Sequence, residues 1–300
     1  MTNLIIIGTI GYDTIETPFG RRDKALGGSA TYASLAASFF TKPGIVAIVG
    51  EDFKQEHRQL LSSRSISLTG LKQVPGKTFA WGGKYEFDMN EAKTQFTDLN
   101  TLLEFDASVP EEYRNAQYVF LANTDPLLQM KVIEQLKNPS LIMMDTMNFW
   151  IQTKKEALLE VIKKVNVLLL NDGEARMLFN TVNLVQAAQS ALKLGPKYVI
   201  IKKGEHGALL FSDGRHFNAP GYPLEILKDP TGCGDSFAGS LIGYLAKYNA
   251  VDEPSLRKAI IYGSVIASYN AEDFSVERLQ RLTDAEIEKR FIEMKKLREF

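Results

Sequence analysis

A glycine-rich turn followed by an aspartate, in the last third of the chain, has the residue types that chemistry on an anion requires. The sequence there reads Lys228-Asp229-Pro230-Thr231-Gly232-Cys233-Gly234-Asp235. Proline and glycine interrupt any preceding strand and an apolar segment with helical spacing follows, so we expect residues 232–234 at a helix N-terminus. Free backbone N–H groups there bind anions, and the helix dipole favours Asp235 in the first turn. A carboxylate base beside an anion site indicates phosphoryl transfer.

Other glycine-rich patterns are alternatives for this turn. A capped helix entered through a glycine turn would look the same locally. A Walker A loop is excluded, because it ends in Gly-Lys-Ser/Thr and no lysine stands near Gly234. The dinucleotide-binding and protein-kinase loops are excluded as well, since both need a third glycine where Phe237 stands.

The bulk composition favours a soluble protein that acts on small molecules. The 300 residues are 45% hydrophobic, enough to bury one large core, and the formal net charge is −1. Such a chain has no general attraction to nucleic acid or anionic membranes. The single cysteine excludes an intramolecular disulfide, and the three histidines have no metal-ligand spacing. With no secretory signal and no apolar run of the ~20 residues that span a bilayer, we expect a cytoplasmic location.

The elements that must position the turn alternate between strands and helices. Residues 4–7 form a continuous apolar run, typical of a strand buried on both faces of a parallel sheet. Ser29 is a candidate N-cap for a small-residue helix over residues 29–40, and a strand follows at 45–49. Further strands are predicted at 118–121, 141–144, 167–170 and 198–202, with helices at 127–136, 154–164 and 184–194. This order predicts a three-layer α/β domain with right-handed crossovers.

Two stretches do not fit this alternation. Residues 12–17, and residues 78–87 with 94–97, have strand composition and turn residues, but too little helix separates them for parallel crossovers. We expect them to form a small separate sheet. An antiparallel extension at the edge of the main sheet is the alternative.

The turn resembles the carboxy-terminal signature Asp-Thr-x-Gly-Ala-Gly-Asp of the ribokinase (PfkB) family of carbohydrate and nucleoside kinases. Proline replaces the signature's threonine and cysteine replaces its alanine, and both changes keep the backbone donors. The resemblance implies that Asp235 is the catalytic base. It also implies that the N–H groups of Gly232, Cys233 and Gly234 form an anion hole for the transferred phosphoryl group.

The same resemblance implies a domain organisation and a set of cofactors. A single ribokinase-like αβα domain would span residues 1–300, with segments at about residues 11–24 and 76–98 forming a β-sheet lid over the acceptor and often a dimer contact. The implied cofactors are ATP and Mg²⁺, with a monovalent cation such as K⁺ near Asp229 and Thr231.

Two motifs in the amino-terminal part match the acceptor site of this family. Asp13 follows the first strand, where the family keeps an aspartate that binds acceptor hydroxyls. A carboxylate accepts two hydroxyl hydrogen bonds at once, although a lone aspartate after a strand also forms turns. The second motif, Gly27-Gly28-Ser29-Ala30-Thr31-Tyr32, resembles the family's Gly-Gly motif at the hinge below the lid. Ribokinase has asparagine where Tyr32 stands, which argues against free ribose. The tyrosine would stack on a sugar or base, or pack within its helix. The implied acceptor-binding residues are Asp13, Gly27, Gly28, Tyr32 and Asn123.

The carboxy-terminal half carries motifs that the family uses for the nucleotide. Asn171 and Glu174 resemble its Asn-x-x-Glu motif, which holds Mg²⁺ through bound water, but they also match a helix capping box. Residues 200–207 resemble the strand and glycine turn beside the nucleotide, and a small-residue helix at 260–268 suits an adenine pocket or plain core packing. The implied nucleotide-binding residues are Asn171, Glu174, Lys202, Gly204, Gly207, Ser264 and Ser268.

The resemblance implies transfer of the γ-phosphoryl group of ATP to a hydroxyl of a small sugar. A nucleoside acceptor is the alternative, since Tyr32, Phe79 and Trp81 are candidate stacking surfaces. A non-catalytic sensor of ATP or sugar is a second alternative, against which the intact Asp235 argues. Residues 145–150 lack the arginine of the family's Asp-x-Asn-x-Arg motif, which argues against an acidic acceptor. A homodimer through the lid is also expected.

Overall fold

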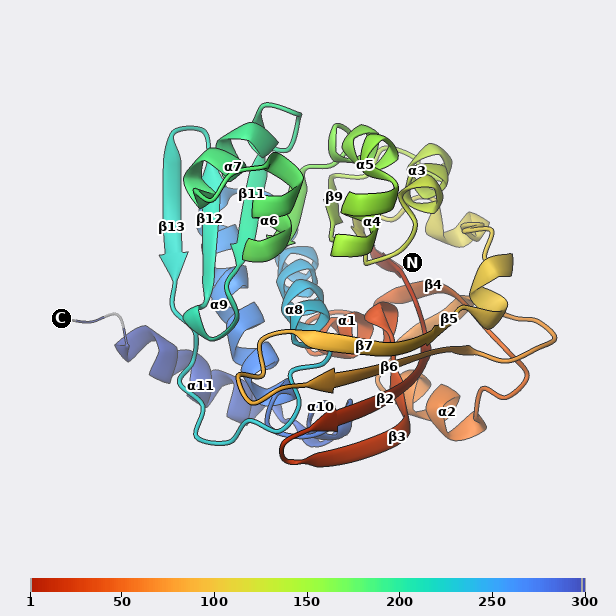
Figure 1. Cartoon of the computed structure of the whole chain (residues 1–300). Helices are drawn as coiled ribbons and strands as arrows, with labels where there is room; N and C mark the ends of the chain where they lie inside the picture. The colour runs from red at the N-terminus through yellow and green to blue at the C-terminus, as the bar shows by residue number, and fades with distance from the viewer. Residues whose placement is uncertain (1, 298, 300) are drawn as a thin grey trace.

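A nine-stranded sheet forms the centre of the molecule. The computed structural model describes residues 2–297 and 299, so residues 1, 298 and 300 of the predicted domain lie outside the described residues. The strands of the main sheet are β1 (Leu4–Ile7), β4 (Gly44–Val49), β5 (Ser67–Gln73), β8 (Tyr118–Leu121), β9 (Leu141–Met144), β10 (Val167–Asn171), β11 (Tyr198–Lys202), β12 (Ala208–Ser212) and β13 (Arg215–Ala219). Their order is β13-β12-β11-β10-β9-β8-β1-β4-β5. Figure 1 labels the strands near both edges of this sheet, β13 and β12 at one edge and β4 and β5 at the other.

The predicted strands are all present, and they pair in parallel from β5 through β11 in this order. The prediction missed β5, β12 and β13. Strands β12 and β13 are antiparallel to their neighbours and need no α-helical crossover, so the strand–helix alternation gives no signal for them. Strands β5 and β13 lie at the two edges and carry exposed polar residues, including Lys72 and His216, instead of a continuous apolar run. The main sheet is therefore mixed.

Helices cover both faces of this sheet because its strands are apolar on both faces. In β1, Leu4 and Ile6 belong to one buried cluster, whereas Ile5 and Ile7 belong to a second cluster on the opposite face. The first cluster contacts α1 (Ser29–Ala37), α2 (Gln55–Ser63), α8 (Cys233–Tyr248), α9 (Glu253–Asn270), α10 (Glu277–Arg281) and α11 (Asp284–Lys296). The second contacts α3 (Pro126–Gln135), α4 (Asn148–Thr153), α5 (Lys155–Ile162), α6 (Asp172–Phe179) and α7 (Leu184–Leu192). The three-layer prediction is confirmed.

Short 3₁₀ helices complete the connections at η1 (Asn100–Glu104), η2 (Glu111–Tyr113) and η3 (Gly204–His206). Among the helices that the structure describes, none has the length and apolar character needed to cross a bilayer.

Close packing of α8 on α1 sets the position of the glycine-rich turn. A Cβ added at Gly239 would lie 2.1 Å from the Ala33 carbonyl oxygen, so only glycine allows the two helices to approach this closely. The predicted N-cap of α1 was wrong by one residue. Gly28 occupies the cap position, and Ser29 is the first helical residue, whose Oγ accepts a hydrogen bond from the Thr9 N–H at 3.1 Å. The starts of α1 and α8 therefore lie together at one edge of the main sheet.

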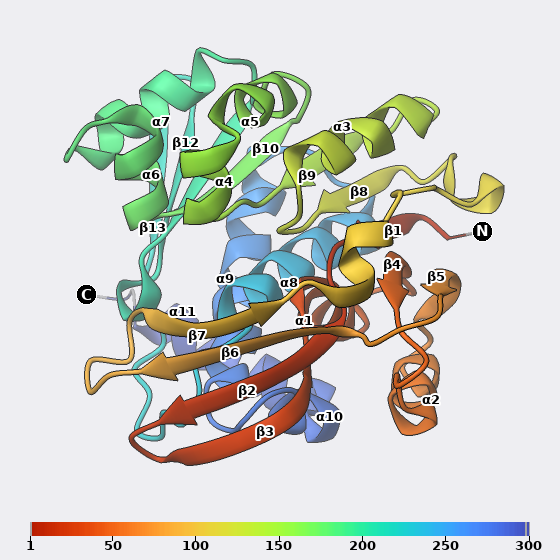
Figure 2. The same ribbon diagram turned by 45° about the vertical axis from the view of Figure 1, so that its right-hand side comes forward.

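A second, four-stranded sheet lies apart from the main sheet (Figure 2). Its strands, in the order β3-β2-β6-β7, are β2 (Gly11–Thr17), β3 (Gly20–Gly27), β6 (Phe79–Tyr85) and β7 (Ala92–Asp98). The predicted separate sheet is thus present, and the edge-extension alternative is wrong. Strand β3 was not predicted because its first residues, Gly-Arg-Arg-Asp-Lys, are polar and exposed. We call β3, β2, β6 and β7 the small sheet.

Side chains at one end of the small sheet dock it onto the rest of the molecule. Ile15, Tyr85 and Met89 form a buried cluster with Phe274, which follows α9. The Tyr85 hydroxyl also lies 3.2 Å from Thr231 Oγ1 in the glycine-rich turn, and these two groups are hydrogen-bonded. The small sheet therefore contacts the turn that the sequence analysis singled out.

Candidate active site

The glycine-rich turn has the predicted relation to its helix. Gly232 occupies the N-cap position of α8 with a left-handed backbone (φ 75°), and a Cβ there would lie 2.3 Å from the Tyr32 ring. Among the described residues, the N–H groups of Gly232, Gly234 and Asp235 have no acceptor, whereas that of Cys233 donates to the Pro230 carbonyl at 3.1 Å. The candidate anion hole therefore differs from the prediction by one donor. The Cys233 N–H closes the turn, and the Asp235 N–H is available in its place.

Asp235 lies in the first turn of α8 as predicted. Burial raises the pKa of its carboxyl to about 7, the charge of Asp145 raises it as well, and Lys202 opposes the rise. A carboxylate with a pKa near 7 is a better proton acceptor than an ordinary aspartate. The neighbouring Cys233 thiol has a pKa raised to about 12 by burial, so it stays protonated and is no nucleophile.

Asp229 is fully buried and anchors the turn. Its two carboxylate oxygens accept hydrogen bonds from the N–H groups of Thr231 and Ser275, each at 2.9 Å. Burial nevertheless raises the pKa of Asp229, and no lysine or arginine of the described chain forms an ion pair with it. Asn270 donates to the Thr231 carbonyl at 2.8 Å, while its own Oδ1 is buried with no donor. Around Asp229 and Asn270, the hydrogen-bond acceptor oxygens therefore outnumber the available N–H and O–H donors.

Asp13, on β2, is the second carboxylate with a strongly changed pKa. Burial raises that pKa to about 8, the charges of Asp229 and Asp235 raise it further, and the Gly28 N–H partly offsets them. A Cβ at Gly27 would lie 1.9 Å from Asp13 Oδ2, so the Gly-Gly motif makes room for this carboxylate. The structure thus brings together Asp13, Gly27, Gly28 and the glycine-rich turn.

The other two predicted acceptor residues have different surroundings. Tyr32 is 1% exposed and its ring faces Gly232, which favours the packing alternative over stacking on a ligand. Asn123, at the end of β8, accepts a hydrogen bond from Trp150 Nε1 at 3.0 Å and contacts Met147 Sδ through its amide nitrogen. Its carbonyl oxygen accepts from Ser29 Oγ at 3.3 Å, which links it to the start of α1.

On the other side of the site, Asn171 and Glu174 form a complete capping box. The Glu174 N–H donates to Asn171 Oδ1 and the Asn171 N–H donates to Glu174 Oε2, both at 2.7 Å. Burial raises the pKa of Glu174 to about 7, an effect that Lys202 opposes and Asp145 reinforces. Oε1 of Glu174 has no hydrogen-bond partner in the described part of the chain. The two interpretations of this motif are therefore compatible, since capping uses only one carboxylate oxygen.

Lys202, at the end of β11, is directed into the site. Its Nζ lies 2.5 Å from Asp145 Oδ2 and 3.3 Å from the position that a Cβ would take at Gly234. Asp145 was not among the predicted site residues, although an aspartate directly after a buried strand was a usable signal. Open α/β sheets bind ligands at the carboxyl ends of their strands, and Asn123, Asp145, Asn171 and Lys202 all lie at that edge.

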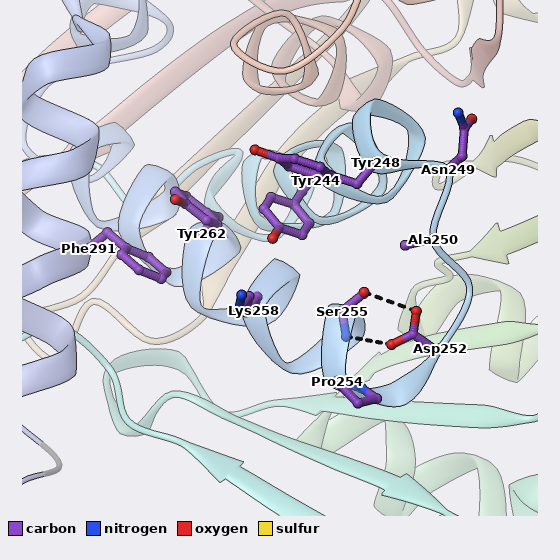
Figure 3. A pocket seen from close by; sticks show the side chains of 10 residues that line it. All are labelled: Tyr244, Tyr248, Asn249, Ala250, Asp252, Pro254, Ser255, Lys258, Tyr262 and Phe291. Atoms are coloured by element: carbon purple, nitrogen blue, oxygen red, sulfur yellow. Dashed lines mark hydrogen bonds between the residues drawn. The ribbon is translucent and has the colours of Figure 1, made fainter.

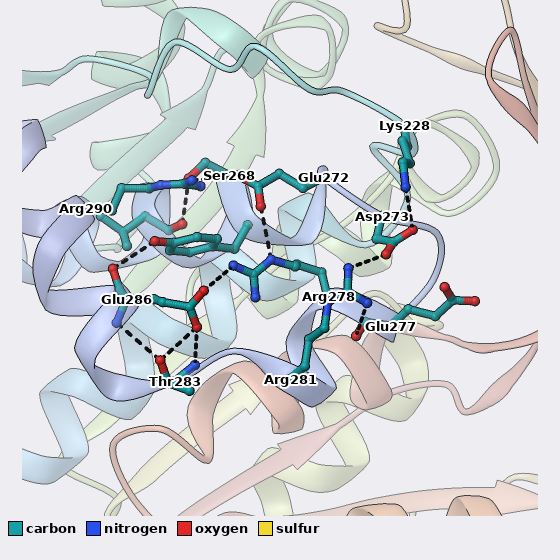
Figure 4. Close-up of polar contacts among 12 residues, drawn as sticks. Lys228, Ser268, Glu272, Asp273, Glu277, Arg278, Arg281, Thr283, Glu286 and Arg290 are labelled. Carbon is teal, nitrogen blue, oxygen red and sulfur yellow. Dashed lines mark hydrogen bonds and ion pairs between the residues drawn. The ribbon is translucent and has the colours of Figure 1, made fainter.

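The predicted nucleotide residues in and after η3 and on α9 are largely buried or held by contacts within the protein. Gly207 has a φ of 85°, and a Cβ there would lie 2.0 Å from the Ala219 carbonyl, so glycine is required for the backbone itself. Ser264 is 9% exposed. Ser268 Oγ donates to the Val265 carbonyl and accepts from Arg290, within an ion-pair network that joins α9, α10 and α11 (Figure 4). Ser268 therefore has a structural contact independent of any nucleotide.

The turn between β6 and β7 also reaches this side. Glu91 Oε1 lies 3.8 Å from the position of a Cβ at Gly173, and Asn90 Oδ1 lies 3.9 Å from that at Gly204. The small sheet thus extends from Asp13 to the predicted nucleotide residues, beyond the acceptor side alone.

A cavity of about 600 Å³ lies elsewhere, between the end of α8 and the start of α9 (Figure 3). Its lining includes Tyr244, Tyr248 and Tyr262, and none of the predicted site residues. At a rise of ~1.5 Å per residue, Tyr248 is roughly 20 Å along α8 from Asp235, so this cavity is separate from the site around that aspartate.

Comparisons with known proteins identify the family of this chain. The family model described as pfkB family carbohydrate kinase matches residues 1–279. A cytidine kinase from Thermococcus kodakarensis is 33% identical over 259 residues, covering 83% of this chain and 89% of that protein. A nucleoside kinase from Methanocaldococcus jannaschii is 25% identical over 290 residues, with 89% of each chain covered.

Solved structures show the same fold. The crystal structure of a Methanocaldococcus jannaschii nucleoside kinase superposes with a TM-score of 0.79 at 20% identity, covering 97% of this chain and 99% of that one. A candidate ribokinase II from E. coli, in complex with ATP and Mg²⁺, superposes with a TM-score of 0.80 at 19% identity, covering 98% and 99%. The chain therefore belongs to the pfkB family of carbohydrate kinases, and it is a phosphotransferase that acts on a hydroxyl acceptor.

Proposed function

We propose that this protein is an ATP-dependent nucleoside kinase, which transfers the γ-phosphoryl group to a hydroxyl of a nucleoside. This gives preference to the acceptor that the sequence analysis held as its alternative to a small sugar. The cytidine and nucleoside kinases among the relatives support a nucleoside, and so does an apolar surface at the acceptor end of the site.

This apolar surface consists of Met147, Phe149 and Trp150, which we call the apolar shelf. Met147 is 39% and Phe149 is 51% exposed, and the Phe149 and Trp150 rings pack edge to face with centroids 4.8 Å apart. Large exposed apolar side chains at the carboxyl edge of a sheet suit a planar base, which has two apolar faces, better than a free sugar, whose hydroxyls leave only a small apolar face. The shelf is the observation that carries this proposal.

Contacts connect the shelf to the carboxylates. Trp150 donates to Asn123, and the Asn123 carbonyl accepts from Ser29, which follows the Gly27-Gly28 pair beside Asp13. A nucleoside with its base on the shelf would direct its ribose toward Asp13. The Asp13 carboxyl group, which burial keeps protonated up to its raised pKa of about 8, would accept hydrogen bonds from ribose hydroxyls through both oxygens once it ionises.

In the proposed reaction, Asp235 accepts the proton of the attacking hydroxyl. The free N–H groups of Gly232, Gly234 and Asp235 lie at the positive end of α8 and stabilise negative charge on the transferring group. Since the transition state of phosphoryl transfer is loose, positioning and electrostatic stabilisation contribute more than the strength of the base.

The residues on the nucleotide side of the site fit ATP and Mg²⁺. Mg²⁺ is usually held by one or two carboxylates together with water and phosphate oxygens, and Glu174 Oε1 is an acceptor without a partner in the described chain. The described residues contain no cluster of three or more histidine, cysteine or acidic groups that could hold a metal, so most ligands would come from nucleotide and water. Lys202, Gly204, Gly207, Ser264 and Ser268 are the proposed nucleotide contacts.

A monovalent cation such as K⁺ fits beside Asp229 and Thr231. The buried Asp229 carboxylate has no cationic partner among the described residues, and the nearby Asn270 Oδ1 has no donor. A cation held by oxygen atoms would satisfy both groups. A homodimer through the small sheet, whose strands β3 and β7 are largely exposed, remains a prediction that light scattering would test.

The test of the function is a coupled assay of ADP release over two panels, one of ribonucleosides and one of free sugars. We expect turnover with at least one nucleoside and none with free ribose or fructose. Replacement Phe149→Ala should reduce kcat/KM for that nucleoside about tenfold, since stacking of a base on an aromatic ring contributes roughly 1–3 kcal/mol. The control Phe19→Ala, at a 62% exposed phenylalanine between β2 and β3, should have no effect. Turnover of sugars alone would contradict the proposal.

A further inference from the structure

Lys202 occupies a position that nucleotide binding alone does not explain. Its side chain is only 17% exposed, and its ammonium group forms an ion pair with Asp145, whose side chain is 5% exposed. Asn171 and Lys202 are paired residues at the ends of β10 and β11, and Asp145 directly follows β9 on the other side of β10. The lysine side chain therefore crosses the end of β10 to reach its partner.

Asp145 is itself held in place, so it can fix the lysine. Its Oδ1 accepts the N–H of Thr146 at 3.0 Å, and its backbone carbonyl accepts from the buried Gln129 amide at 3.2 Å. Oδ2 remains for Lys202 at 2.5 Å. A carboxylate anchored in this way limits the ammonium group to one location.

That location is the start of α8, between the proposed donor and acceptor sides. Gly234 has no side chain, and the space where its Cβ would lie is 3.3 Å from Lys202 Nζ. The ammonium group thus lies beside Gly234, whose N–H has no acceptor among the described residues, and its charge acts on the Asp235 carboxyl group. Burial alone would lower the pKa of Lys202, but the carboxylates of Asp145, Glu174 and Asp235 outweigh it and raise that pKa, so the group stays charged.

We propose that Lys202 is a catalytic residue that contacts the transferring phosphoryl group, and that Asp145 is the positioning residue that keeps the ammonium group beside Gly234. This inference rests on the proposed kinase function. A phosphoryl oxygen at the Gly232 and Gly234 amides would receive the lysine charge in addition to the backbone donors. The lysine charge would then stabilise the transition state. It would also hold the γ-phosphate in line with the acceptor hydroxyl that is hydrogen-bonded to Asp235.

A purely structural ion pair makes a different prediction for paired substitutions. Removal of one partner from a buried pair leaves an uncompensated charge and destabilises the fold, whereas removal of both is often neutral. Lys202→Met and Asp145→Asn should therefore each lower the melting temperature, and the double variant should regain most of it. If the pair had only a structural role, kcat would recover together with the stability.

The experiment measures the melting temperature, kcat and both KM values for wild type, the two single variants and the double variant, with ATP and the best nucleoside. We expect the double variant to melt near the wild-type temperature while its kcat stays about 10²–10³-fold lower, the loss typical of one removed charge-stabilising donor. The KM for the nucleoside should be unchanged. For Asp145→Asn we expect kcat at least about tenfold lower, because the lysine is retained but no longer fixed.

The control is Glu253→Gln, which removes the charge partner of Arg257 in a half-buried pair of α9 with the same 2.5 Å separation, where the arginine side chain is 42% exposed. It should lower the melting temperature and leave kcat unchanged. A double variant with kcat within about threefold of wild type would overturn the inference. Wild-type protein without turnover on any acceptor would instead refute the proposed function, so the two failures are distinguishable.

Discussion

Asp13→Asn should stabilise the ligand-free protein at alkaline pH, and the effect follows from the surroundings of this carboxyl group. Burial and the charges of Asp229 and Asp235 raise the pKa of Asp13 from 3.8 to about 8 in the folded chain. Between these two values the folded protein holds a proton that the unfolded chain has lost. The free energy of unfolding therefore falls as pH rises, by about 1.4 kcal/mol per pH unit, until the folded carboxyl ionises.

Asparagine has nearly the same shape as aspartate but no proton to lose, so it removes this pH dependence. Over the interval from about pH 6 to pH 8, the stability of Asp13→Asn relative to wild type should increase by about 2 kcal/mol. Below the ordinary pKa, where both states of the wild-type carboxyl are protonated, the advantage should disappear. Burial of Asp13 therefore lowers the stability of the ligand-free protein. The same burial keeps water away from the carboxyl group that would bind acceptor hydroxyls.

Urea unfolding, followed by circular dichroism at several pH values, measures this difference directly. The control Asp98→Asn changes an exposed aspartate of the same small sheet and should stay within about 0.5 kcal/mol of wild type at every pH. Asp13 would not be desolvated if the free energy of unfolding of Asp13→Asn differed from that of wild type by the same amount at about pH 6 and at about pH 8. The same variant should lose kcat/KM for the acceptor at least about tenfold, with the KM for ATP unchanged.

Three further predictions test the remaining parts of the site. Asp235→Asn should fold normally but lose about 10²–10⁴-fold in kcat, and near wild-type turnover of this variant in steady-state kinetics would contradict the prediction. The wild-type kcat should decrease at pH values under about 7, where the raised pKa of Asp235 leaves the base protonated. Exchange of K⁺ for tetramethylammonium should lower kcat in wild type and have no further effect in Asp229→Asn, measured in the same assay. Acceptor binding should protect the amides of β2 and β6 from hydrogen exchange more than ATP does, and equal protection without ligand would indicate a rigid small sheet.

The sequence by itself determined the features that depend on short stretches of backbone. The Gly232–Asp235 turn at a helix start, the strand–helix alternation and the separate small sheet each follow from the local order of glycine, proline and apolar residues, and the structure contains all three. The capping box of Asn171 and Glu174 was equally readable, since both partners lie within one helical turn.

Only the tertiary structure decided how these pieces combine into a site. Asp145 and Lys202 are 57 positions apart and meet because their strands flank β10, so no local pattern reveals the pair. Stacking on a ligand and packing within the helix were equally open for Tyr32, and the close approach of α1 and α8, which places its ring on Gly232, favours packing. The pKa values of Asp13 and Asp235 have the same origin, because desolvation and the charges of neighbouring elements act through space and depend on which segments the fold brings together.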